Sequence, residues 1–232
     1  MNDEKEVKNK EKDGKEVISV GERLRREVLS WFWVILIFLF IHGSIVQARV
    51  IPSGSMEQTL LVGDHLLVDR FGYSAEIPFT GIRWTLWREP KRQQIVVFRR
   101  PGQADFVKRI IGMPGDTLEV RNGAVYINGA PLDEPYAYNI RPFEEGGPWH
   151  VPPGHYFMMG DNRGNSNDSR MWENPYVPRE DIIGTPLVIY MSIEAPGEDA
   201  WQPGHLPERF RAYLAALVRP ERIRWGRLLH TF

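Results

Sequence analysis

Hydrophobic and polar positions divide the chain into three parts. Residues 1–27 are mostly polar, with Lys and Glu intermixed, a pattern typical of a solvated tail. Residues 28–46 read VLSWFWVILIFLFIHGSIV and contain no Asp, Glu, Lys or Arg. About 20 such residues are enough to cross a bilayer as a helix. From Arg49 onward, short apolar runs alternate with Gly, Pro, Asn and Asp, which predicts strands joined by turns.

The long apolar run has two interpretations, an uncleaved membrane anchor or a cleaved secretory signal. Trp31 and Trp33 stand near its start, where indole rings favour the membrane interface. Residues 46–48 resemble a cleavage site, but the polar region before the run is longer than that of a usual signal peptide. We therefore expect a transmembrane anchor over residues 28–48. Three arginines precede the run and only Arg49 closely follows it, so the positive-inside rule predicts a cytoplasmic N-terminus and an extracytoplasmic remainder.

The remainder, residues 49–232, is predicted to be a mainly β domain. Seven β-branched or aromatic runs are typical of strands: HLLVDRF, QQIVVFRR, DFVKRIIG, DTLEVRN, AVYINGA, HYFMMGD and PLVIYMSI. Asn122-Gly123 stands between TLEV and AVYI, a strong hairpin signal. Because long helices do not alternate with these runs, the pattern favours an antiparallel β-barrel or sandwich.

One segment of the β domain has a helical pattern. Residues 207–218 read PERFRAYLAALV, and helical spacing puts the following side chains on one face: Phe210, Tyr213, Leu214 and Leu217. We expect this face to pack against the β domain. The second interpretation is a helix that lies on a membrane surface.

Composition removes several classes of function. The net charge is −1, so the chain lacks the basic footprint of a nucleic-acid-binding protein. The absence of cysteine excludes disulfides and thiolate metal sites. The sequence has no P-loop, no GxGxxG and no HExxH, and its six histidines show no metal-ligand spacing. We therefore expect neither a metal nor a cofactor.

Three polar stretches are candidates for chemistry. The first is PSGSM, residues 52–56. A serine hydroxyl needs a base to become a good nucleophile, while a second hydroxyl and a backbone N–H can together hold an oxyanion. Gly54 lets backbone approach a ligand closely. The alternative is a turn that leads away from the anchor.

The second and third stretches would supply a base and its surroundings. Lys108 lies in FVKRIIGMPGD, between apolar neighbours of a predicted strand. Burial lowers the pKa of a lysine and makes its neutral amine a base; alternatively the side chain faces solvent. Residues 160–170, GDNRGNSNDSR, are too long and polar for an ordinary turn, and they predict either a buried polar network or a surface loop.

Together and in this order, the three stretches resemble the motifs of bacterial type I signal peptidases, the Ser-Lys leader peptidases. The resemblance covers about residues 30–193. It implies that Ser55 is the nucleophile and Lys108 the general base. It also implies an oxyanion hole made by the Ser53 hydroxyl and the Ser55 N–H, with Ser166 orienting the lysine.

The resemblance implies further residues and a place of action. A supporting ionic network would consist of Arg109, Asp161, Asp168 and Arg170. Shallow apolar pockets for the substrate would be formed by Ile51, Met56, Leu60, Val97, Phe106 and Val107. The enzyme would remove N-terminal signal peptides from exported pre-proteins at the bacterial inner membrane, with a small cap around residues 117–159. One departure is Gln58, which stands where the family commonly has proline.

Two alternatives to a general signal peptidase stay open at this point. One is a specialised Ser-Lys leader peptidase with a dedicated substrate. The other is a membrane-anchored β-barrel adaptor that has lost activity. The sequence does not indicate the oligomeric state.

Overall fold

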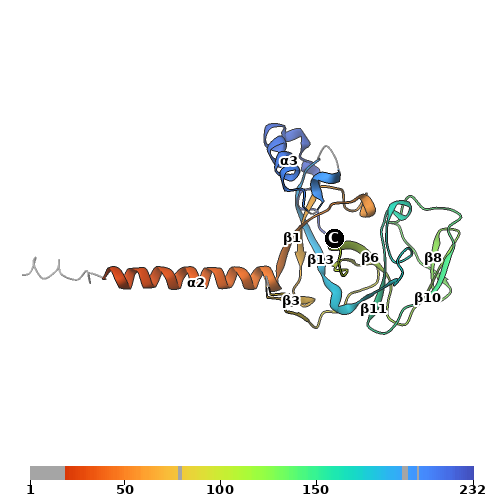
Figure 1. The fold of residues 1–232 in the computed structure, drawn as a ribbon. Coiled ribbons are helices and arrows are strands. Elements are labelled where there is room, and N and C mark those ends of the chain that lie inside the picture. Colours follow the sequence, from red (N-terminus) through yellow and green to blue (C-terminus); the bar gives the residue numbers. More distant parts are fainter. Residues whose placement is uncertain (1–18, 78–79, 195–197, 203) are drawn as a thin grey trace, which may run out of the picture. The chain divides into compact units, whose positions relative to one another are not determined.

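The structure, a computed structural model, describes residues 19–77, 80–194, 198–202 and 204–232 (Figure 1). Most of the polar tail expected over residues 1–27 lies outside these ranges. The chain separates into two compact units, Met1–Ile41 and His42–Phe232. The second unit contains all the strands that the structure describes and every residue of the candidate site.

The first described element is one long helix, α2 (Val20–Ser44). Ser19 accepts the N–H of Glu22 while the Glu22 carboxylate accepts the N–H of Ser19, a reciprocal cap that fixes the start of the helix. Among the described residues, α2 alone is long and apolar enough to cross a membrane. The helix begins eight residues before the expected anchor range 28–48 and ends at Ser44, because residues 46–48 pair with a neighbouring strand.

The centre of the second unit is a seven-stranded sheet in which every neighbouring pair of strands is antiparallel. In spatial order its strands are β1 (Val46–Val50), β2 (Asp64–Asp69), β13 (Ile182–Ser192), β5 (Ile95–Phe98), β6 (Phe106–Gly112), β11 (His155–Met159) and β12 (Tyr176–Pro178). The expected antiparallel β class is therefore confirmed. The described strands form an open sheet rather than a closed barrel, because β1 and β12 remain its two edges.

Two smaller sheets extend this core. Four strands follow the order β10 (Gly146–His150), β7 (Thr117–Arg121), β8 (Ala124–Ile127) and β9 (Ala130–Pro131). Asn122 and Gly123 join β7 to β8 with φ of 51° and 77°. Positive φ at both positions is the geometry of a type I′ hairpin turn, so the predicted hairpin is confirmed. The third sheet pairs β3 (Ser74–Glu76) with β4 (Arg83–Thr85).

Helix α3 (Leu206–Val218) has the predicted bounds within one residue but not the predicted packing. Its buried side chains are Ala212 and Ala216, and these contact a cluster that includes Ile193 and Trp201. The large apolar side chains point outward: Phe210, Leu214 and Leu217 are exposed. The expectation that these three pack on the β domain is therefore wrong. Alanine lets the helix approach closely, and only Tyr213 of the expected face is partly buried.

Short 3-10 turns complete the fold. They are η1 (Gly54–Met56), η2 (Arg163–Asn165), η3 (Arg179–Asp181), η4 (Glu198–Trp201), η5 (Pro220–Arg222) and η6 (Trp225–Arg227). The first two carry parts of the candidate site, and η1 is bonded through its carbonyls to the residue that precedes η2.

Candidate active site

Ser55 sits in η1, the single 3-10 turn that follows β1. Its neighbour Met56 is buried in the core with Leu60 and Leu66, which holds the turn against the sheet. The N–H groups at the start of a helical turn have no partner within the turn. Consistent with this, the N–H of Ser55 donates to no group in the described part of the chain.

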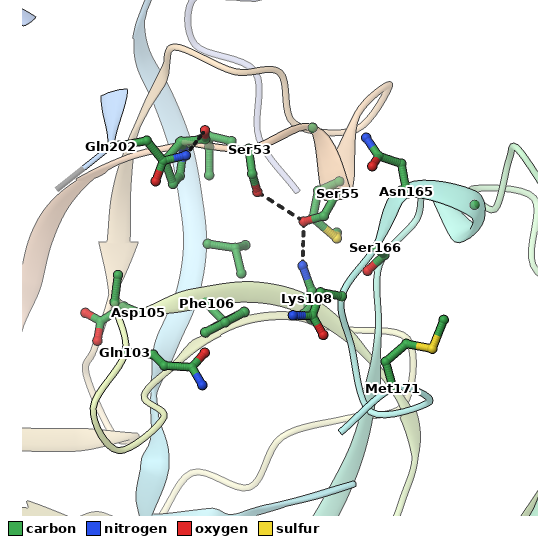
Figure 2. A pocket seen from close by; sticks show the side chains of 18 residues that line it. Ser53, Ser55, Gln103, Asp105, Phe106, Lys108, Asn165, Ser166, Met171 and Gln202 are labelled. Atoms are coloured by element: carbon green, nitrogen blue, oxygen red, sulfur yellow. Dashed lines mark hydrogen bonds between the residues drawn. The ribbon is translucent and has the colours of Figure 1, made fainter. Parts of the chain in front are cut away.

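Lys108 reaches this serine from the middle of β6. Strand alternation turns its side chain to the same side of the sheet as η1, and the residue is only 3% exposed. Its Nζ donates a hydrogen bond to Ser55 Oγ (Figure 2). Two residues that are 53 positions apart in the chain are thereby brought into direct contact.

The surroundings of Lys108 favour its neutral form. Burial lowers the pKa of the amine from 10.5 to about 8, although the negative charges of Asp168 and Asp161 oppose the shift. Desolvation acts in this direction because an ammonium ion loses its hydration shell in the interior. A lysine of this kind can exchange a proton near neutral pH.

The structure brings the other two expected serines to the same cleft. Ser53 Oγ lies 3.4 Å from Ser55 Oγ, so that Ser55 contacts both Ser53 and Lys108 (Figure 2). Ser166 also lines the cleft. Its Oγ is buried and makes no hydrogen bond of normal geometry within the described residues, although it lies close enough to Asp168 to help lower the pKa of that carboxyl. The bond expected between Ser166 and Lys108 is therefore not formed in this structure.

Asp161 connects the turn that carries Ser55 to the strand that carries Lys108. Its carboxylate is fully buried and accepts two hydrogen bonds from Arg109, at 2.9 and 2.6 Å. It also accepts the hydroxyl proton of Thr59 at 2.6 Å. Because Arg109 follows Lys108 directly and Thr59 follows the turn that carries Ser55, one carboxylate holds both sides of the contact between Ser55 and Lys108.

Asp168 and Arg170 form the second half of the expected network. Arg170 donates to Asp168 through Nε and Nη2, both at 2.9 Å. Burial by itself raises the pKa of Asp168, but the hydrogen bond and charge of Arg170 outweigh it and hold the pKa below its usual value. Asp168 also accepts the N–H of Gly160 at 3.0 Å, which shapes the loop around Ser166.

Sequence reasoning missed several residues that hold these loops. Asn162 donates its N–H to the carbonyl of Ser55 at 3.1 Å and its side-chain amide to the carbonyl of Gly54 at 3.0 Å. Glu134 forms two hydrogen bonds with Arg163, and Glu144 forms two with Arg170. The spacing of charges along the chain gives no indication of such partners, which lie more than twenty residues apart.

Sequence reasoning also missed the contact that ties the end of the chain to the loop after Ser55. Asp64 is fully buried and accepts hydrogen bonds from Ser192 and Arg227. Arg227 also donates to the carbonyl of Thr59 at 2.9 Å. Nothing in the sequence marks Arg227, 163 positions further on, as the partner of Asp64.

The cleft around the dyad has a volume of about 750 Å³. Four of the expected substrate-pocket residues line it: Ile51, Met56, Phe106 and Val107. Leu60 and Val97 do not; both are completely buried in the core behind it. The lining is polar next to Phe106, since Asp105 also lines the cleft and pairs with Arg49 at 2.5 Å.

The structure explains why Gln58 departs from the common proline. Glu57 has φ −52° and ψ 152°, Gln58 has φ 73°, and the N–H of Thr59 donates to the carbonyl of Met56 at 3.1 Å. This is a type II turn with a positive φ at its third residue. The ring of proline fixes φ near −65°, so proline does not fit this turn at position 58.

Comparison with known proteins agrees with this geometry. The family model described as "Signal peptidase, peptidase S26" matches residues 24–191, which include the dyad and both supporting loops. The chain belongs to this signal peptidase family.

Three relatives illustrate the extent of the similarity. The "Signal peptidase I" of Pseudomonas aeruginosa is 33% identical, over 75% of this chain and 77% of that protein. The protein of the same name from Pseudomonas fluorescens is 33% identical, over 84% of this chain and 82% of its own length. The Aquifex aeolicus "Signal peptidase I" is 32% identical, over 89% of this chain and 99% of its own. The family match ends before α3 and the turns that follow it.

Proposed function

We propose that this member of the signal peptidase family cleaves N-terminal signal peptides from exported pre-proteins with Ser55 as nucleophile and Lys108 as general base. The observation that carries the assignment is the hydrogen bond between the buried Lys108 amine and the Ser55 hydroxyl. A serine becomes a strong nucleophile when a base within hydrogen-bond reach takes its proton. The membership of the family supplies the substrate class.

The reaction is acyl transfer to water. Neutral Lys108 accepts the hydroxyl proton as Ser55 Oγ forms a bond to the scissile carbonyl carbon. When the tetrahedral intermediate collapses, the peptide C–N bond breaks and Lys108 returns the proton to the leaving amine. In the second half, Lys108 takes a proton from water, whose oxygen attacks the ester, and the Ser55 hydroxyl is restored.

The oxyanion of the intermediate needs donors that are already in place. The free N–H of Ser55 and the hydroxyl of Ser53 are the two donors beside the reacting oxygen. Losing one such donor typically slows a reaction by about 10²–10³. Asp161, Arg109, Asp168 and Arg170 act indirectly, because their contacts fix the loops rather than the reacting atoms.

The apolar part of the cleft suits small side chains before the cleaved bond. Ile51, Phe106 and Val107 line it close to Ser55, and Leu60 and Val97 support it from behind. Helix α2 would span the membrane with the arginines at its start on the cytoplasmic side, which leaves the β domain outside the cytoplasm. The catalytic domain then meets signal peptides where they leave the bilayer.

Cleavage of a defined pre-protein by the full-length enzyme in detergent micelles tests the assignment. The wild type should release the mature protein, while Ser55→Ala and Lys108→Ala should show no turnover above background. Lys91→Ala, which removes an exposed lysine near the turn before β5, is the matched control and should retain normal activity. A Lys108→Ala enzyme that cleaves at the normal rate would falsify the dyad.

The same assay separates the remaining alternatives. An inactive adaptor would leave every pre-protein intact even with the wild-type chain. A specialised peptidase would cut only one or a few members of a panel of unrelated pre-proteins. Cleavage of most of the panel between the signal peptide and the mature protein supports a general signal peptidase.

A further inference from the structure

Helix α3 has its apolar face on the outside. Three large apolar residues of the expected face are exposed, Phe210 by 62%, Leu214 by 46% and Leu217 by 78%, and Leu206 and Val218 are exposed by 68% and 81%. At 100° per residue, all five fall within one third of the helix circumference. The helix thus packs on its own domain through small alanines and presents its large side chains outward.

The charges near this face favour an anionic partner. Residues 204–232 contain six Arg and two Glu, a net charge of +4 with His neutral, in a chain whose net charge is −1. Arg211, Arg219 and Arg222 have side chains without a hydrogen bond or ion pair to any residue that the structure describes. Two copies of α3 brought face to face would repel each other, since each segment carries the same positive charge.

We propose that α3 is an interfacial helix that lies on the anionic surface of a lipid bilayer, with its outer apolar face in the boundary between headgroups and acyl chains. Helices with Leu and Phe on one face and arginines beside it bind membranes in this way. One residue separates the end of α2 from β1. If α2 spans the membrane, the domain is tethered to that surface, and the high effective concentration makes a weak lipid contact significant.

The position of α3 in the fold gives this contact a consequence for the cleft. Arg209 of α3 donates to the carbonyls of Trp201 and Gln202, at 3.1 and 3.4 Å. Gln202 lines the cleft and donates to the carbonyl of Pro52 at 3.1 Å; this contact lies next to Ser53 in Figure 2. A helix that rests on lipid would therefore hold one edge of the cleft at the membrane surface.

The absence of cysteine from the chain allows a direct test with single labels. Phe210→Cys and Leu217→Cys place an environment-sensitive fluorophore on the outer face, and Glu208→Cys places it on an exposed polar position of the same helix. The labelled full-length proteins are reconstituted in phosphatidylcholine vesicles with and without phosphatidylglycerol. Quenchers are attached to the lipids either near the headgroup or at the bilayer centre.

We expect blue-shifted emission from labels at positions 210 and 217 but not from the label at position 208. Shallow quenchers should act more strongly than deep ones, since such helices insert only about 5–10 Å. Removing phosphatidylglycerol, or the double change Arg211→Glu and Arg219→Glu, should weaken the quenching.

Equal quenching at all three positions would overturn the proposal. A blue shift without quenching by the labelled lipids would also overturn it. If that blue shift disappeared when the protein was diluted in lipid, the partner of α3 would be a second copy of the chain. None of these positions belongs to the active site, so a failure here says nothing against the proteolytic assignment.

Discussion

The Nζ of Lys108 and the Oγ of Ser55 are hydrogen-bonded in the interior of the β domain, where neither side chain has appreciable contact with solvent. The pair joins the centre of β6 to the turn after β1. Burial supplies the chemistry of this contact, since it lowers the pKa of the lysine against the opposing charges of two aspartates.

The first prediction concerns pH. Only neutral Lys108 can accept the Ser55 proton, and its pKa of about 8 leaves about a tenth of the enzyme active at pH 7. We expect kcat/KM to rise about tenfold per pH unit below 8 and to level off above it. The measurement is peptide cleavage from pH 5.5 to 9.5, with the thermal midpoint followed over the same range. A flat profile in a folded enzyme would exclude Lys108 as the base.

The second prediction tests whether Ser166 orients the Lys108 amine or only contributes to folding. If its hydroxyl orients the Lys108 amine during the reaction, Ser166→Ala should lower kcat by about tenfold, the value of one hydrogen bond of about 1.4 kcal/mol. The same change should leave the thermal midpoint close to that of the wild type, because the buried hydroxyl makes no hydrogen bond of normal geometry.

Ser169→Ala is the matched control for this change. Ser169 accepts the N–H of Met158 at 2.8 Å, so its loss should lower the thermal midpoint and leave the pH profile of kcat unchanged. An enzyme with Ser166→Ala and undiminished kcat would contradict an orienting role.

The third prediction concerns the contact between Arg227 and Asp64. Arg227→Ala leaves a fully buried carboxylate without its main cation, and breaking a buried pair in this way typically costs about 3 kcal/mol or more. We expect a lower thermal midpoint and a lower kcat, since Arg227 also holds the carbonyl of Thr59. Arg227→Lys should recover part of the stability. Arg222 has no such partner among the residues described, so Arg222→Ala should behave like the wild type. If Arg227→Ala had the same thermal midpoint and kcat as Arg222→Ala, the contact between Arg227 and Asp64 would be dispensable.

The fourth prediction concerns the turn after the nucleophile. Gln58→Gly should raise the free energy of unfolding by up to about 1 kcal/mol, since glycine adopts a positive φ without strain. Gln58→Pro should lower it by about 2–3 kcal/mol and reduce activity, because its ring cannot adopt this φ. Gln58→Ala, which retains the strain, should be close to the wild type. The measurement is thermal unfolding of the three variants. A Gln58→Pro variant as stable as the wild type would contradict a positive φ at this position.

The sequence predicts local features of this protein better than distant ones. Asn122-Gly123 specifies its hairpin through its own backbone preferences, and Ser55 and Lys108 stand in motifs that can be recognised singly. The pairing of Glu134 with Arg163 depends on how the small sheet meets the loop after β11, which no local pattern encodes. For α3, periodicity correctly predicted a helix but not its buried face, because the side chains that face the domain are the small Ala212 and Ala216 and not the large apolar ones.

The residues of the site are far apart in the sequence, and this determines when the site can form during folding. Ser55 and Lys108 are 53 positions apart, and Thr59 and Asp161 are 102 apart. Ser55 and Lys108 meet only when the sheet and its loops are assembled. A chain that has not finished folding therefore lacks the proposed dyad, and proteolysis through this pair can begin only after folding.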